Sequence, residues 1–69
     1  MENIKSINYP NTLRGDYQSY ITVGEEGCIK IEKIYKNGEM AAIGWIRVEY
    51  ENGNVAEIKE SICDLHGEL

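Results

Sequence analysis

The sequence predicts an all-β domain, a small antiparallel meander whose strands close into a barrel. Isoleucine and valine dominate the aliphatic residues, leucine is scarce and phenylalanine is absent; β-branched residues pack well on a pleated surface. Asn-Gly occurs twice between strand-like runs, which is the strongest short-range hairpin signal. A chain of 69 residues has room for one hydrophobic core, so residues 1–69 form a single domain.

The strand pattern is clearest after residue 16. The first predicted strand begins at Tyr17 and ends before a turn with two glycines, Gly24 and Gly27, which permit a tight reversal of the chain. Three further runs follow, at residues 28–35, 40–50 and 55–59. Asn37-Gly38 and Asn52-Gly53 separate these runs, so we expect two consecutive hairpins.

Residues 1–16 permit more than one interpretation. Ile4 and Ile7 are three positions apart, which fits an edge strand or a helical turn. Pro10, the only proline, lies in a predicted turn between Tyr9 and Asn11.

The pairing of the last two runs can be tested by asking which side chains would face each other. A two-residue turn at Asn52-Gly53 would place Val48 opposite Glu57, which mixes charge with core. A three-residue loop, 51–53, with Gly53 in the left-handed conformation pairs apolar with apolar residues and opposite charges with each other. We therefore predict the pairs Ile46–Ile58, Val48–Ala56 and Arg47–Glu57.

The third run changes its alternation at Gly44. Ile43 and Trp45 are apolar at odd positions, whereas Ile46 and Val48 are apolar at even positions. A glycine at such a point is typical of a bulge or a sharp bend. A bent strand can contribute to two faces, so we expect an SH3-like or OB-like barrel.

The C-terminal segment predicts a short helical turn near the end of the chain. Ile62 and Leu65 are three apart, with Ser61 before them and Gly67 after them. The stretch from Trp45 to Leu65 resembles in outline the later strands of an SH3 or Tudor-type barrel. This resemblance covers about a third of the chain and is one of topology.

Charge limits the classes of partner. The net charge is −5, and all of it lies in residues 39–69, which carry seven acidic and two basic side chains. An acidic chain repels phosphate, so we expect no direct contact with nucleic acid. No apolar run is long enough to span a membrane, and the first residues lack the pattern of a signal peptide. We expect no membrane contact, and we expect the cytoplasm as the location.

The sequence offers little for catalysis or metal binding. Cys63 and His66 could supply two metal ligands and Cys28 a third, but a structural zinc site needs four. No phosphate-binding loop can be written. We expect no enzymatic activity, no metal and no cofactor. The cysteines are expected to be reduced, with a Cys28–Cys63 disulfide as the alternative.

The aromatic residues divide between core and surface. We expect Trp45, the largest side chain, to lie in the core, and Tyr35 and Tyr50, next to the hairpin turns, to be more exposed. Tyrosine is common at protein interfaces, where an apolar ring is wanted beside a hydrogen-bonding hydroxyl. An acidic face rimmed by two tyrosines therefore predicts a partner-binding surface, made of Glu49, Tyr50, Glu51, Glu57, Glu60 and Tyr35.

The leading functional hypothesis is a small protein-binding module without catalysis. Complementary charge selects a partner with a basic surface. One version is a phage or mobile-element inhibitor, of the anti-CRISPR or anti-restriction type, that blocks a basic nucleic-acid-binding surface. The alternative is an SH3- or Tudor-like accessory subunit that binds a peptide or self-associates through a sheet edge, giving a homodimer.

Overall fold

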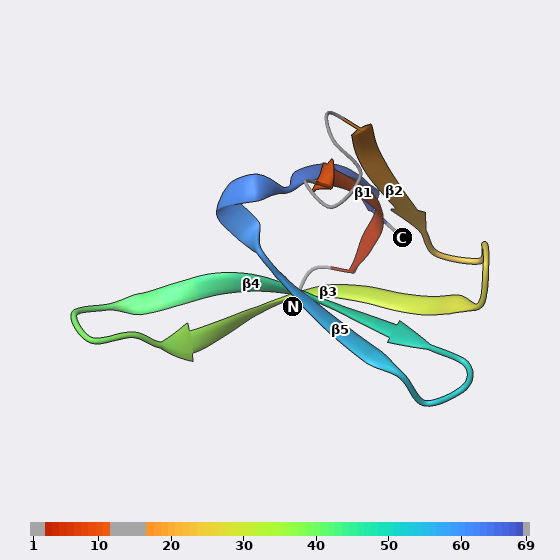
Figure 1. Cartoon of the computed structure of the whole chain (residues 1–69). Coiled ribbons are helices and arrows are strands. Elements are labelled where there is room, and N and C mark those ends of the chain that lie inside the picture. The colour runs from red at the N-terminus through yellow and green to blue at the C-terminus, as the bar shows by residue number, and fades with distance from the viewer. Residues whose placement is uncertain (1–2, 12–16, 69) are drawn as a thin grey trace.

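The computed structural model describes residues 3–11 and 17–68 and consists almost entirely of β-strands (Figure 1). Residues 1–2, 12–16 and 69 lie outside the described part, so the predictions for residues 1–16 are tested only in part. One 3-10 helix separates the last two strands. In chain order the elements are β1 (Ile4–Asn11), β2 (Tyr17–Thr22), β3 (Cys28–Asn37), β4 (Ala42–Tyr50), β5 (Val55–Lys59), η2 (Glu60–Ile62) and β6 (Asp64–Glu68).

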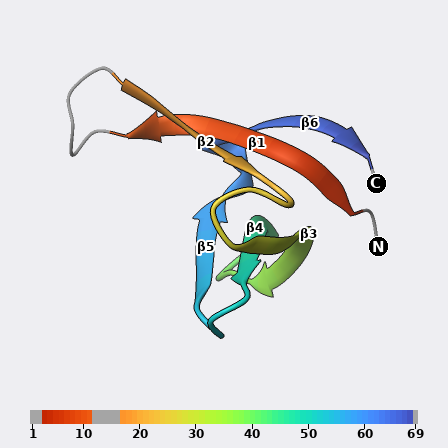
Figure 2. The same cartoon turned by 90° about the vertical axis from the view of Figure 1, so that its right-hand side faces the viewer.

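The strands form two antiparallel sheets of three strands each. Their orders are β2-β1-β6 and β3-β4-β5, and Figure 2 shows the first sheet lying across one face of the second. The predicted all-β fold and meander are confirmed. The described strands do not close into a barrel: a single bridge, between Asn3 and Glu32, joins the two sheets. The SH3-like or OB-like barrel is therefore not confirmed.

The β4–β5 hairpin has the predicted register. Ile46 pairs with Ile58, Val48 with Ala56 and Arg47 with Glu57. The Tyr50 N–H donates to the Asn54 carbonyl, which closes a three-residue loop, and Gly53 has a φ of 89°. The pattern of apolar and charged side chains was sufficient to choose between the two loop lengths.

The β3–β4 hairpin is also present, with a longer loop than Asn37-Gly38 suggests. Asn37 belongs to β3 and pairs with Ala42. The loop is residues 38–41, in which the Gly38 N–H donates to the Ala41 carbonyl over 2.9 Å.

The first strand is central in its sheet. The segment is a strand, as one of the two predicted alternatives had it, but β1 pairs with β2 along one edge and with β6 along the other, so the edge position and the helical turn are wrong. Ile4 and Ile7 are both buried. The turn predicted at Pro10 is also wrong, because Pro10 is part of β1 and pairs with Gln18.

Gly44 does not mark a bulge. β3 and β4 pair without interruption around Gly44, and the register shift lies between Cys28 and Lys30 at the other end of β3. Gly44 is on the same face as Ile46, where the side chain of Glu60 lies against it. The change in alternation therefore reflects a close approach of η2 to β4.

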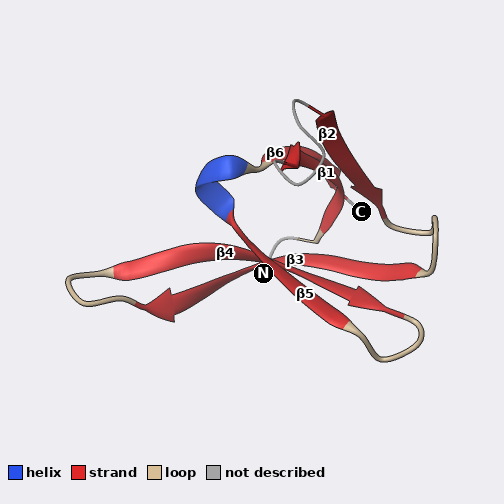
Figure 3. Cartoon of the chain, in the orientation of Figure 1, coloured by secondary structure: helices blue, strands red, loops and turns tan. Residues whose placement is uncertain are grey.

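The C-terminal segment combines a helical turn with a strand. The 3-10 helix η2 is the short blue segment in Figure 3 and ends at Ile62. Residues from Asp64 onward form β6, in which Leu65 pairs with Ile7. The predicted helical turn is present but begins earlier, and the strand after it was not predicted.

The core lies between the two sheets. Its buried side chains come from β1, β3 and β4: Ile4, Ile7, Cys28, Ile31, Ile46 and Val48. Tyr50 is partly buried and packs against this cluster. Trp45 pairs with Ile34 and Lys59 on the opposite face of the β3-β4-β5 sheet and is not part of the core. The predictions for Trp45 and Tyr50 were therefore wrong, whereas Tyr35 is 65% exposed as expected.

Within residues 3–11 and 17–68, no helix has the length and apolar character needed to cross a membrane.

Candidate functional site

The outer face of the β3-β4-β5 sheet carries two of the predicted site residues, and both have a basic neighbour. Oε1 of Glu49 lies 3.4 Å from Nη2 of Arg47, and the Glu57 carboxylate forms an ion pair with the Lys36 ammonium group. The Lys36 ammonium group also lies over the Trp45 ring, 4.8 Å from its centre. Acidic and basic side chains alternate on this face. The face therefore favours neither a basic nor an acidic partner surface.

Glu32, on the same face, is buried to 6% exposure. Its Oε2 accepts no hydrogen bond but lies 3.2 Å from the Lys30 ammonium group. The ion pair compensates the buried charge, so we assign Glu32 a structural role.

Two further predicted site residues lie on the opposite face of the sheet. Glu60, in η2, forms a 2.8 Å ion pair with Lys33, and the ammonium group of Lys33 lies 5.1 Å from the centre of the Tyr35 ring. The hydrogen bond that the Lys33 ammonium group donates to the Glu60 carboxylate is the main cause of a raised pKa at Lys33. The Lys33 ammonium group therefore contacts both the Glu60 carboxylate and the Tyr35 ring.

Glu51 and Tyr50 lie at the other end of the molecule, where β4 enters its turn. The Glu51 N–H donates to the Gly27 carbonyl over 2.9 Å, and the side chain of Glu51 lies beside the Gly27 Cα. These contacts bring the turn between β2 and β3 against the turn between β4 and β5. The six predicted site residues thus fall into three places and do not form one acidic face.

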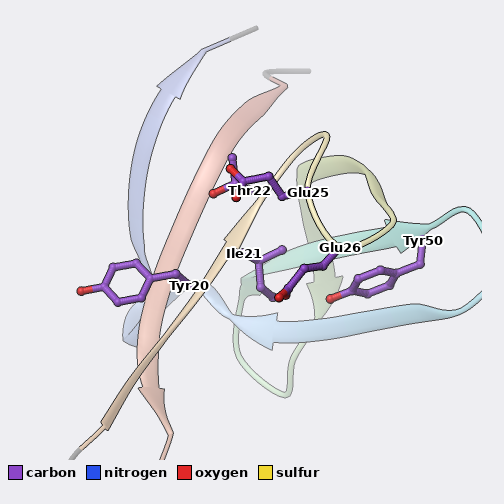
Figure 4. Close-up of a pocket in the computed structure, with 6 residues that line it drawn as sticks. All are labelled: Tyr20, Ile21, Thr22, Glu25, Glu26 and Tyr50. Atoms are coloured by element: carbon purple, nitrogen blue, oxygen red, sulfur yellow. The ribbon is translucent and has the colours of Figure 1, made fainter.

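A pocket of about 250 Å³ lies where these two turns meet. Figure 4 shows the Tyr50 hydroxyl directed toward the Glu26 side chain, the Glu26 carboxylate lying beside Ile21, and the Tyr20 ring directed away from these residues. Tyr20 is 69% exposed. The pocket is lined by Tyr20, Ile21, Thr22, Glu25, Glu26 and Tyr50.

The carboxylates near this pocket form no ion pair with any residue that the structure describes. In the described part of the chain, Glu32, Glu49, Glu57 and Glu60 take part in salt bridges, but Glu25, Glu26 and Glu51 do not. No basic side chain lines the pocket. This end, defined by Glu25, Glu26, Glu51 and Tyr50 and termed the acidic end below, therefore carries three carboxylates that form no ion pair with a described residue.

Tyr50 keeps its proton at neutral pH. Burial is the main cause of its raised pKa, and electrostatic interactions with Cys28, Tyr9 and Glu26, in that order, add to the effect. The hydroxyl is therefore a hydrogen-bond donor as well as an acceptor, and the ring offers an apolar surface beside a carboxylate.

Sequence reasoning missed Glu25 and Glu26. Both were assigned to a turn between Gly24 and Gly27, and both are in that turn. Two adjacent carboxylates in a tight turn were a usable signal. Their proximity to Tyr50 depends on the pairing of Cys28 with Tyr50, which joins distant parts of the sequence.

The residues weighed as metal ligands or catalytic groups lie apart from this pocket. His66 contacts the Asn8 side-chain oxygen through Nε2, on the outer face of the β2-β1-β6 sheet. Cys28 is buried in the core, Cys63 is partly buried, and both are free thiols. Among the described residues, no group of three or more His, Cys, Asp or Glu side chains is placed to hold a metal ion.

Comparisons of the chain with known protein families, with curated proteins and with solved structures give no match.

Proposed function

We propose that this protein is a small protein-binding module without catalytic activity, and that its acidic end faces a basic surface on a partner protein. The observation that carries the proposal is the group of three carboxylates without ion pairs, Glu25, Glu26 and Glu51, beside a pocket lined by Tyr50. Uncompensated charge speeds encounter with an oppositely charged surface and selects against acidic partners.

The pocket gives this surface a point of attachment. A volume of about 250 Å³ suits one long side chain of a partner. A lysine or arginine placed there would have the Glu26 carboxylate as a counter-ion and the Tyr50 ring as an apolar wall. One version of the proposal is an inhibitor of the anti-CRISPR or anti-restriction type, which covers the basic surface where a phage-targeting enzyme holds nucleic acid.

The experiment is an affinity capture from bacterial lysate at low and moderate salt, read by mass spectrometry. The test variant is Glu26→Lys with Glu51→Lys. The matched control is Glu39→Lys with Asp64→Lys, which makes the same change in net charge at residues outside the acidic end. We expect the wild type and the control to retain the same nucleic-acid-handling protein, the test variant to lose it, and salt to release it.

Either of two results would contradict the proposal. Equal retention by the test variant would show that the acidic end is not the contact surface. Retention of no common protein by the wild type and the control would remove the basis for a protein-binding role.

A second candidate function is an SH3- or Tudor-like accessory subunit. The order of elements supports it: a three-stranded meander, then a 3-10 helix, then a last strand that returns to pair with the first. Its binding would use aromatic side chains or a sheet edge, so moderate salt would leave it unchanged.

A further inference from the structure

The β5 strand has one open edge. β5 pairs with β4 on one side, and no described strand pairs with its other side. The opposite edge of the same sheet, β3, is met by Asn3 through its bridge to Glu32. β5 is therefore the uncovered edge of the meander, and it contains no proline or bulge that would prevent another strand from pairing with it.

The direction of the free backbone groups follows from the hairpin. Because the Tyr50 N–H donates to the Asn54 carbonyl, Tyr50 and Asn54 form a hydrogen-bonded pair, and such pairs recur at every second residue along an antiparallel ladder. Ala56 and Ile58 thus bond to β4. The N–H and C=O groups of Val55, Glu57 and Lys59 point toward the open edge.

The side chains of these three residues lie on the outer face of the sheet. Val55 is 48% exposed, and Glu57 and Lys59 are also exposed. An acidic and a basic residue two positions apart make the edge self-complementary. In a two-fold antiparallel pairing centred on Ile58, Glu57 of each copy lies opposite Lys59 of the other.

The competing registers are less favourable. Centring the pair on Glu57 places two glutamates directly opposite each other, which destabilises a sheet. Centring it on Ala56 places Glu57 opposite Val55, without a charge partner. The pairing centred on Ile58 overlaps residues 57–59 of the two β5 strands, and both of its hydrogen-bonded rungs join opposite charges.

We propose that the β5 edge binds a second copy of this chain, with Glu57 opposite Lys59 in both directions, to give a continuous sheet of two meanders. This interaction does not depend on the acidic end, because Glu25, Glu26 and Glu51 lie outside β5. The test of the β5 edge and the test of the acidic end can therefore give different outcomes.

The test is sedimentation equilibrium over a range of protein concentrations, with variants that reverse one charge. Lys59→Glu and Glu57→Lys each place like charges at both rungs, and we expect each to weaken dimerisation by about tenfold or more. A mixture of the two restores opposite charges at both rungs, so it should form heterodimers. The double variant, Glu57→Lys with Lys59→Glu, should dimerise as the wild type does.

Several outcomes would overturn the proposal: a monomeric wild type at all concentrations, single variants that dimerise as tightly as the wild type, or a mixture that stays monomeric. Glu57 also contacts Lys36, so far-UV circular dichroism checks the fold of Glu57→Lys. Lys59 has no ion pair within the described residues, so Lys59→Glu remains informative if that variant does not fold.

Discussion

The Glu60 carboxylate occupies the space that a side chain at residue 44 would fill. An added Cβ on Gly44 would overlap Oε1 of Glu60, while Oε2 of Glu60 lies 2.8 Å from the Lys33 ammonium group. The absence of a side chain on Gly44 thus leaves room for an ion pair between η2 and β3.

We expect Gly44→Ala to change stability little. The atom in the way is the end of a flexible side chain, so Glu60 can swing aside. The lost contact is a partly exposed ion pair, worth at most ~1 kcal/mol. Alanine recovers roughly 0.5–1 kcal/mol relative to glycine in a strand. Urea unfolding of Gly44→Ala, Glu60→Gln and the double variant measures how far the effects of residues 44 and 60 on the free energy of unfolding depend on each other. A loss of more than about 1.5 kcal/mol in Gly44→Ala would show that the backbone of η2 had to move.

Gly38→Ala should be more harmful. A Cβ there would lie 2.8 Å from the Ala41 carbonyl oxygen and 2.8 Å from Cδ1 of Ile43. Because the carbonyl belongs to the backbone of a four-residue loop, the loop must shift, and we expect a loss of about 1–2 kcal/mol in the free energy of unfolding. Gly44→Ala is the matched comparison. Equal stability of the two variants would contradict this explanation.

Ile46 provides a graded test of the core. Its side chain is fully buried between the sheets, so Ile46→Val should cost about 1 kcal/mol and Ile46→Ala about 2–5 kcal/mol. A domain of this size has only ~3–5 kcal/mol of net stability, so Ile46→Ala should be largely unfolded in circular dichroism at 25 °C. Val55→Ala, at an exposed position, serves as the control and should unfold at nearly the wild-type urea concentration. If Ile46→Ala still folded cooperatively, the result would contradict the assignment of Ile46 to the core.

Stability should fall in mild alkali. Burial is the main cause of a raised pKa at both Cys28 and Cys63. Below the unfolded-state thiol pKa of about 8.5, both states hold the protons and stability is fully present. As the pH rises above that value, the unfolded chain loses its thiol protons first, and the free energy of unfolding declines until the folded-state pKa is passed.

Urea unfolding between about pH 7.5 and about pH 9 measures this decline while most tyrosine, with an ordinary pKa of about 10, still holds its proton. Cys63→Ala should make the slope shallower. Stability that is constant or rising over this interval would contradict the assignment.

The two thiols should differ in reactivity toward a thiol reagent such as Ellman's reagent. Cys28 is 2% exposed, whereas Cys63 is only partly buried. We expect Cys63 to react first in the native protein and Cys28 to react only when the fold opens. Comparison of Cys28→Ala with Cys63→Ala assigns the two phases. A fast phase that survives in Cys63→Ala would contradict the burial of Cys28.

Local patterns predicted the meander well because register there is decided between neighbours in sequence. Ile46 opposite Ile58 and Arg47 opposite Glu57 follow from alternation and a three-residue loop. The tail shows the limit of such reasoning. The spacing of Ile62 and Leu65 indicated a helix, but Leu65 pairs with Ile7 at the far end of the sequence, and this long-range pairing determines the strand.

The candidate site was harder to predict because charge compensation depends on strand neighbours. The sequence places Arg47 opposite Glu57, and the register confirms it, yet the ion pair of Glu57 is with Lys36 of β3, while Arg47 lies beside Glu49. Glu26, in contrast, has no ion pair within the described residues and lies near Tyr50. Counting charges along the chain identified the acidic half, but only the fold distinguishes paired carboxylates from free ones.

The pairing of β1 with β6 has a consequence for synthesis of the chain. Ile7 is fully buried at the centre of its sheet, between Ile21 of β2 and Leu65 of β6. During translation the meander can form early, because its contacts are between neighbours in sequence, but β1 lacks one of its two partners until β6 has left the ribosome. Until then, the nascent chain exposes the edge of β1 that β6 will cover, and this is the interval in which a chaperone or another nascent chain could bind it.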